Sequence, residues 1–257
     1  MSDSHWKTVA ASVAGTSHVA KNTECQDFYD RQIAGLSGEI FIAVVADGAG
    51  SAKMGAFGAK TACQTLVREI RSVVEKENKI NAITHGRALE WIKLLQTQFQ
   101  VLAEAEKLET SDFACTLLCA TIQSDTSIFW QIGDGGIIYA TSDAPDEYQL
   151  VTAPQQGEYA NMTNFVTDRE AAAALKFETI EKQIDEIAIF TDGLQRIALD
   201  YQTGSAHAPF FRPMFAPLRS ERIFPNLDEK LQDFLDSPKI NERTDDDKTL
   251  VLASRKV

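Results

Sequence analysis

Three Asp-Gly pairs in this sequence each follow an apolar run, at Asp47, Asp134 and Asp192. An Asp-Gly pair between two strands is typical of a tight hairpin turn. A hairpin suffices for Asp134, which lies between two strand-like runs in "FWQIGDGGIIYA". After Asp47 and Asp192 the pattern becomes helical instead, so a hairpin does not explain these two acids. A helix N-cap would explain either one alone, because Asp is a favoured capping residue.

A third acidic group, Asp245 to Asp247, precedes the last apolar run. By itself it is explained as a solvated turn. Several carboxylates at one end of a sheet, however, repel one another unless a cation lies between them. Magnesium and manganese prefer oxygen ligands, and a glycine after a ligand Asp lets the backbone carbonyl approach an ion. The residues therefore predict an oxygen-ligand metal site, and the sequence has no His-rich or Cys-rich set for zinc.

The composition limits the classes of partner. The chain of 257 residues is 44% hydrophobic and 24% charged, an ordinary globular balance, and its formal net charge of −12 argues against a nucleic-acid groove. No apolar stretch is long enough to span a membrane, and the start has no signal pattern, so we expect no membrane partner. The four cysteines form no Cys-x-x-Cys pair, which with the lack of a signal predicts reduced thiols and a cytoplasmic location.

The apolar periodicity predicts alternating groups of strands and helices. We expect an antiparallel pair of long helices, and a meander of three strands in the middle of the chain. The pattern predicts an α+β fold in one domain over residues 1–257, and it leaves 153–183 and 201–225 unassigned. The expected strands are 6–15, 40–48, 113–123, 127–135, 136–141, 185–193 and 248–256, and the expected helices are 54–77, 89–102, 194–200 and 227–237.

Five short segments, in this order along the chain, resemble the motifs of the metal-dependent type 2C serine/threonine protein phosphatases. They are "GTSHVAKNTECQDFY", "VVADGAGSAKMGAFGAKTA", "ACTLLCATIQSDTSIFWQIGDGGIIYA", "AIFTDGLQRI" and "DDDKTLVL". Three features are most similar to a compact bacterial subgroup of that family: His18 in place of an Arg, the run Cys25-Gln26-Asp27, and "YANMTNF". The resemblance implies an αββα sandwich, in which helix pairs flank two antiparallel sheets and metals lie in a cleft at one end.

The resemblance also implies a set of metal ligands for two or three Mn²⁺ or Mg²⁺ ions. Asp47 would bridge two ions, and the Gly48 carbonyl would bind one of them. Asp192 and Asp246 would complete the ligands of the other ion. Asp27 would hold a water of the metal shell or help to bind a third ion.

Some positions depart from the family pattern. His18 stands in the place of a phosphate-binding Arg, and an imidazole is a poorer anion clamp than a guanidinium. Gln26 replaces a Glu, which removes one charge from the metal shell. Ala49 stands where some members carry a His. Asp247 stands at the usual Asn, so the position of the ligand within Asp245 to Asp247 is open by one residue.

The implied function is hydrolysis of phosphoserine and phosphothreonine in proteins, by direct attack of a hydroxide that bridges the metals. Asp47, Asp192 and His18 form the predicted catalytic set. The substrate would be a phosphorylated protein, and a serine/threonine kinase would be the functional partner in bacterial signalling. Two alternatives stay open: hydrolysis of another phosphoester on the same scaffold, and a weakly active or silent phosphatase-like binding protein.

Overall fold

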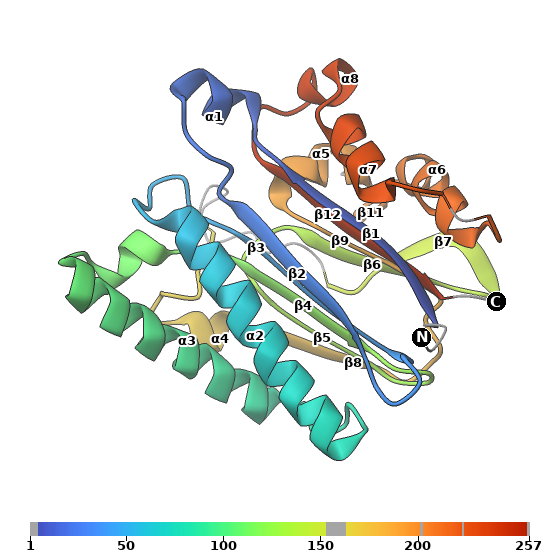
Figure 1. The fold of residues 1–257 in the computed structure, drawn as a ribbon, viewed down its shortest axis with the longest axis horizontal. Coiled ribbons are helices and arrows are strands. Elements are labelled where there is room, and N and C mark those ends of the chain that lie inside the picture. Colours follow the sequence, from blue (N-terminus) through green and yellow to red (C-terminus); the bar gives the residue numbers. More distant parts are fainter. Residues whose placement is uncertain (1–4, 153–162, 201–202, 223, 256–257) are drawn as a thin grey trace.

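The apolar runs form two antiparallel sheets of five strands each in the computed structural model, which describes residues 5–152, 163–200, 203–222 and 224–255 (Figure 1). The first sheet has the order β2 (Asp27–Ala34), β3 (Ile40–Asp47), β4 (Leu117–Ile122), β5 (Ser127–Ile132), β8 (Lys176–Ile180). The second has the order β1 (Trp6–Val13), β12 (Lys248–Arg255), β9 (Glu186–Phe190), β6 (Gly136–Thr141), β7 (Ala144–Leu150). The short strands β10 (Leu199–Asp200) and β11 (Ser205–Ala206) form a separate pair.

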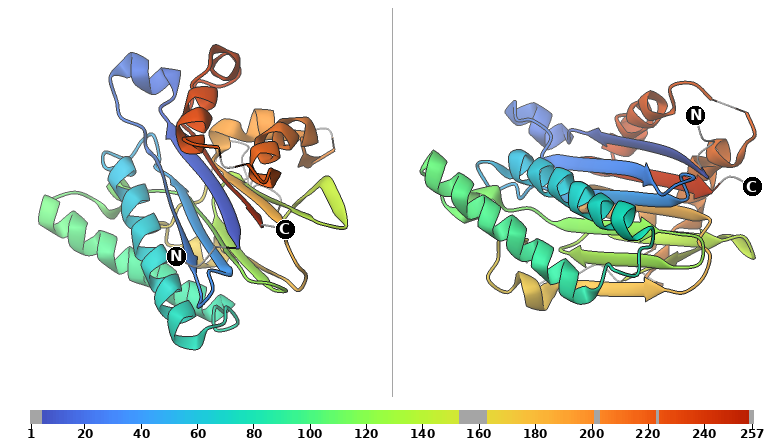
Figure 2. Two further views of the ribbon diagram at one scale, coloured as in Figure 1. Left: turned by 45° about the vertical axis from the view of Figure 1, so that its right-hand side comes forward. Right: turned by 60° about the horizontal axis from the view of Figure 1, so that its bottom comes forward.

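The two sheets pack face to face, and Figure 2 shows helices on the outer side of each. Strands β3 and β4 are buried on both faces, which explains why their sequences are continuously apolar rather than alternating. Alternate residues of these strands point into the layer between the sheets, where the buried side chains include Phe41, Val45, Leu118, Ile189 and Val251. The predicted α+β class and the αββα sandwich are confirmed.

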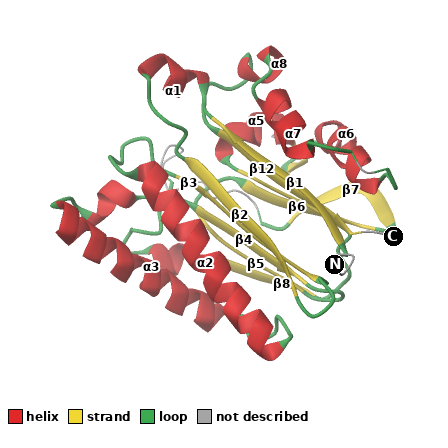
Figure 3. Ribbon diagram, viewed as in Figure 1, coloured by secondary structure: helices red, strands yellow, loops and turns green. Residues whose placement is uncertain are grey.

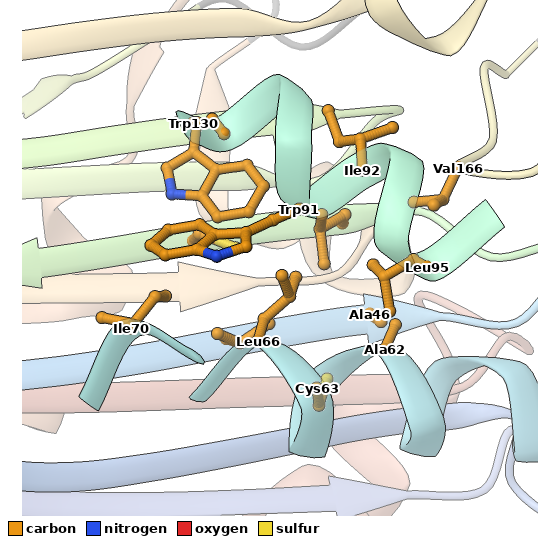
Figure 4. Packing of buried hydrophobic residues seen from close by; sticks show 14 of the residues in the cluster. Ala46, Ala62, Cys63, Leu66, Ile70, Trp91, Ile92, Leu95, Trp130 and Val166 are labelled. Carbon is orange, nitrogen blue, oxygen red and sulfur yellow. The ribbon is translucent and has the colours of Figure 1, made fainter. Parts of the chain in front are cut away.

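Two long helices cover the outer face of the first sheet (Figure 3). Helix α2 (Gly55–Glu77) ends at Asn78, whose backbone is left-handed (φ 50°), and α3 (His85–Glu106) returns in the opposite direction. The hydroxyl of Thr84 caps α3 by accepting from the Arg87 N–H at 3.2 Å. Figure 4 shows Leu66 and Trp91 packing towards Trp130 of β5, so the helix pair and the sheet share one apolar layer.

The outer face of the second sheet is covered by α6 (Ala208–Arg219) and α7 (Leu227–Leu235), with the short helices α5 (Gln195–Ala198) and α8 (Pro238–Asn241) beside them. The sequence leaves α6 unassigned because Pro213 and Pro217 lie inside it, and proline is unfavourable in a helix interior. Its buried phenylalanines, among them Phe211 and Phe215, pack on the sheet and offset that cost.

The predicted three-stranded meander is wrong at its second turn. Strands β4 and β5 do pair as a hairpin, but β5 next pairs with β8, while β6 pairs with β7 and β9 in the other sheet. The segment Gly133-Asp134-Gly135 therefore crosses between the sheets. Both of its glycines have positive φ, +96° and +91°, which lets the chain leave the plane of the first sheet.

The unassigned span 153–183 contains α4 (Ala171–Ala174) and β8 among its described residues. Residues 159–162 of "YANMTNF" lie outside the described ranges. The remaining elements are α1 (Thr16–Lys21) and the 3₁₀ turns η1 (Thr110–Phe113) and η2 (Asp192–Leu194). Within the described ranges, the chain has no helix that combines the length and apolarity needed to cross a membrane.

Candidate metal centre

Asp27 and Asp47 occupy the same end of the first sheet. Asp27 is the first residue of β2, Asp47 is the last residue of β3, and the antiparallel register places them directly opposite each other. Opposite residues of an antiparallel pair project to the same side of the sheet, so the two carboxylates are neighbours. Asp27 is 6% exposed, and its carboxylate therefore lies away from bulk water.

Thr191 connects this end of the first sheet to the second sheet. Its hydroxyl donates to Oδ2 of Asp27 at 2.7 Å and accepts from the Thr249 N–H at 3.0 Å. Thr191 follows β9 directly, and Asp192 comes next in the short turn η2. The topology thus brings Asp192 of one sheet to the Asp27 and Asp47 end of the other.

The N-cap explanation is wrong for both Asp47 and Asp192. The residue that precedes α2 is Met54, and Thr191 is the one that precedes η2; neither makes a capping side-chain bond. Six residues separate Asp47 from Met54, the cap position of α2. Capping therefore does not account for either acid.

Asp246 and Asp247 face different surroundings. Asp247 is 2% exposed and accepts from two backbone N–H groups, that of Gly15 at 2.7 Å and that of Gln26 at 2.6 Å. Asp246 is exposed, lines a cavity together with Asp192, and accepts from the Asp247 N–H at 2.9 Å. Asp247 thus holds loops together, whereas Asp246 faces solvent beside Asp192.

His18 lies on α1, and its Nδ1 is 2.8 Å from Oδ2 of Asp247. The side chain is 14% exposed, so it is largely covered by this contact. Gln26 reaches the same carboxylate through its backbone, and Ala49 is buried, with its N–H donating to the Ala114 carbonyl at 2.9 Å. His18 is therefore close to the acidic end but is directed at Asp247 with one ring nitrogen.

The hairpin expected at Asp134 is wrong, because its segment is a crossover between the sheets. Its carboxylate accepts from the Thr163 hydroxyl at 2.8 Å. Burial raises the pKa of Asp134, and the negative charge of Asp246 raises it further. The sequence did not predict the crossover, because strand-turn-strand patterns look alike whether or not the two strands pair. The run of glycines around Asp134, "GDGG", is the signal that marks an unusual backbone.

Mutual repulsion of the acids appears in their pKa values. Burial raises the pKa of Asp27 to about 8, with added effects of Asp247 and Asp192, although the Thr191 and Thr249 hydroxyls oppose this shift. Burial likewise raises the pKa of Asp192 to about 7, followed by the charges of Asp134 and Asp246.

The pKa of Asp47 is raised well above its ordinary value. The first cause is loss of hydration, and the charges of Asp27, Asp192, Asp246 and Asp134 follow. Four carboxylates thus oppose ionisation of a fifth, and a nearby cation would reverse this effect.

Close backbone approach explains the glycines that follow two of these acids. A Cβ on Gly193 would lie 1.9 Å from the Asp247 carbonyl oxygen, and one on Gly48 would lie 2.3 Å from the carbonyl carbon of Gly55. Neither glycine has a positive φ, so lack of space rather than left-handed backbone requires them. Gly193 lets the turn after β9 touch the segment before β12, which holds Asp192 beside Asp246.

A cavity of about 540 Å³ lies at this end of the molecule. Its lining includes Asp192, Gly193, Arg196, Asn241, Arg243 and Asp246. The cavity is open to solvent.

The residues fit a hard divalent cation by two tests. The donor set consists of carboxylate oxygens, and Oδ1 of Asp27 is buried without a hydrogen-bond partner among the described residues. No three His, Cys, Asp or Glu side chains within the described part of the chain already converge at ligand distance.

The profile of the protein phosphatase 2C family matches residues 14–236, which include Asp27, Asp47, Asp134 and Asp192. Asp246 and Asp247 lie beyond the matched residues. The chain belongs to the protein phosphatase 2C family. The resemblance seen in the five motifs is thus confirmed.

Known members of this phosphatase family resemble the chain over nearly its whole length. Serine/threonine-protein phosphatase 3 of Escherichia coli (strain K12) is 40% identical over 253 residues, which cover 96% of this chain and 98% of that protein. Two solved structures share the fold at lower identity. Serine/threonine phosphatase Stp1 from Staphylococcus aureus has a TM-score of 0.63 and 15% identity, covering 98% of this chain and 95% of its own.

The second structure is the catalytic domain of the serine/threonine protein phosphatase PstP, in complex with two manganese ions. It has a TM-score of 0.64 and 14% identity, and the match covers 98% of this chain and 99% of that domain. At these identities the two structures support the αββα fold, while the family profile and the E. coli relative establish the family.

Proposed function

We propose that this protein is a metal-dependent phosphatase that hydrolyses phosphoserine and phosphothreonine in proteins. Family membership and the 40% identical relative, a serine/threonine-protein phosphatase, support this activity. The single structural observation that carries the proposal is the group of mutually repelling acids at one end of the two sheets, of which Asp27 is buried and Asp47 and Asp192 are half-buried. Such a group is unfavourable without a cation, and a divalent cation beside a solvent-open cavity suits phosphoester chemistry.

Asp47, Asp192 and Asp246 are the proposed carboxylate ligands for Mn²⁺ or Mg²⁺. The choice of Asp246 over Asp247 is supported by the backbone bonds that occupy both oxygens of Asp247. The carbonyl of Gly48 is a further proposed ligand, because no donor among the described residues is bonded to it. When bound, such ions activate water as a nucleophile and offset the negative charge on the phosphoryl oxygens.

Asp27 and Asp134 would extend this set to a further ion. The Thr191 hydroxyl donates to Oδ2 of Asp27. Oδ1 of Asp27 has no hydrogen-bond partner among the described residues. Two ions, as in the PstP domain, or three would then be bound. Thr191 positions the Asp27 side chain by this hydrogen bond. Oδ1 of Asp27 would then bind a metal ion or a water of the metal shell.

His18 is proposed to contact the substrate phosphate through Nε2, since Nδ1 is against Asp247. A partner serine/threonine kinase and a role in bacterial signalling follow from the proposed reaction. A cytoplasmic location is also part of the proposal, and the four free cysteines, three of them buried, support it.

The test is hydrolysis of p-nitrophenyl phosphate and of phosphopeptides across a series of Mn²⁺ and Mg²⁺ concentrations, with a chelator control. Activity should rise with the ion and vanish in chelator. Full activity in excess chelator would contradict the metal-dependent reaction. A panel that compares phosphopeptides with phosphorylated metabolites separates a protein phosphatase from a hydrolase of other phosphoesters, and turnover of neither would indicate a silent binding protein.

A further inference from the structure

Two arginines line the cavity beside Asp192 and Asp246. Arg196 belongs to α5, and Arg243 follows α8. Both side chains are exposed, and no ion pair between described residues involves either of them. In a protein of net charge −12, two unpaired guanidinium groups at the mouth of an acidic cavity are available to an anion from outside.

A second cavity adjoins the first one. It has a volume of about 340 Å³, and the side chains that line it include Ile197, Phe210, Met214, Phe234 and Ile240. Arg243 lines both cavities.

The two cavities share their walls as well as Arg243. On α5, Arg196 faces the first cavity and the next residue, Ile197, faces the second. On α8, Asn241 lines the first cavity and the preceding residue, Ile240, lines the second. The acidic centre, the two arginines and the apolar cavity are therefore successive parts of one continuous surface.

The electrostatics identify the kind of molecule that this surface fits. A phosphorylated segment with acidic flanking residues is repelled by the net charge of this protein and by the carboxylates of Asp192 and Asp246. Arg196 and Arg243 add two positive charges to this lining, which also includes Glu242 and Asp245. A guanidinium binds carboxylates through two parallel N–H groups, which favours a planar acidic side chain.

We propose that Arg196, Arg243 and the adjoining apolar cavity bind the substrate segment that flanks the phosphorylated residue. The arginines select an acidic residue next to the phosphoresidue, and the cavity takes an apolar side chain further along the segment. This inference rests on the proposed function, because it assigns the substrate class of that same site. The alternative is that water contacts both arginines and fills the apolar cavity, and that the substrate segment binds to neither.

The test measures binding rather than turnover. Fluorescently labelled peptides carry a non-hydrolysable phosphonate in place of the phosphate, and their affinity is measured by anisotropy in Mn²⁺. One peptide has an acidic and an apolar flanking residue. A second has the acid changed to its amide, and a third has the apolar residue changed to Ser.

Arg196→Gln and Arg243→Gln should each weaken binding of the first peptide by about three- to fivefold, the effect of losing an exposed ion pair. Neither change should affect the amide peptide as strongly. Met214→Glu should abolish the preference for the apolar peptide over the Ser peptide. Arg222→Gln is the matched control, because Arg222 is also exposed but lines neither cavity.

Equal affinity of the wild-type protein for all three peptides would overturn the inference, whatever the variants do. So would equal losses in Arg196→Gln, Arg243→Gln and Arg222→Gln. The peptide series keeps the test valid if Met214→Glu does not fold, which its thermal melt would show. The substrate p-nitrophenyl phosphate has no flanking residues. Its turnover by the wild-type protein therefore tests the proposed function separately from this inference.

Discussion

Asp27 and Asp47 face each other across the paired strands β2 and β3, so two carboxylates share one side of a buried sheet end. Directly opposed residues have Cβ atoms about 5 Å apart, and like charges in such a pair are destabilising. The fold keeps this arrangement and adds Asp192 from the other sheet. A site so arranged costs stability in the absence of ions and gains it when they bind.

Asp47→Asn should lower kcat by about a thousandfold or more. The reason is that the metal ions would lose a charged ligand, and with it the activation of water as the nucleophile. The same change should leave the metal-free protein as stable as before, or slightly more so, since it removes one of the repelling charges. The measurements are kcat in Mn²⁺ and thermal melting in chelator. Asp192→Asn should behave in the same way.

Asp125→Asn is the control for this pair of variants. Asp125 lies in the turn of the β4–β5 hairpin, where it is exposed and contacts only the neighbouring Ser124 and Thr126 hydroxyls. Asn suits the same turn, so both activity and melting should stay near wild type. If Asp47→Asn melted much earlier but kept normal turnover, Asp47 would be a structural joint and the proposed site would be wrong.

Asp134→Asn should reduce activity by about tenfold or more at limiting Mn²⁺, and less at saturating Mn²⁺. The reason is that Asp134 is half-buried and its charge interacts with those of Asp192 and Asp246. The measurement is the Mn²⁺ concentration that gives half-maximal rate. A wild-type metal dependence in this variant would show that Asp134 serves only the crossover between the sheets.

The contrast between Asp47 and Asp134 shows how far the sequence can predict this site. Asp47 and Asp192 stand where apolar strands give way to helical patterns, and a local pattern is enough to mark them. Whether β6 pairs with β5 or joins the other sheet is decided by long-range packing, which no local pattern contains. The contacts of Asp247 with Gly15, His18 and Gln26 likewise span more than two hundred residues, so only the structure separates it from Asp246.

Metal-free stability should fall as pH rises from about 4 to 8. In the folded protein the pKa of Asp27 is about 8, whereas an unfolded Asp titrates near 3.9. Between these values the folded state binds more protons than the unfolded state, so rising pH favours unfolding. The pKa of Asp192, about 7, acts in the same direction.

Urea unfolding in chelator at several pH values measures this dependence. Asp27→Asn should flatten it, because the variant lacks a carboxyl group whose pKa is raised to about 8 by burial. In excess Mn²⁺ the trend should reverse, since the ions require ionised carboxylates and bind more tightly as pH rises. A wild-type protein whose metal-free stability increased over this range would contradict the buried acidic cluster.

The remaining prediction concerns His18, whose Nδ1 is 2.8 Å from Oδ2 of Asp247 and whose Nε2 is the proposed contact to the phosphate. His18→Ala should raise KM for phosphopeptides by about two- to tenfold, the usual effect of losing one hydrogen bond, with a smaller effect on kcat. It should also lower the melting temperature, because Asp247 joins α1 to the segments of Gly15 and Gln26. His5→Ala, a change at an exposed histidine, is the control for both measurements. A lower melting temperature with an unchanged KM would mean that His18 only supports Asp247, and the phosphate contact would have to be assigned to another residue.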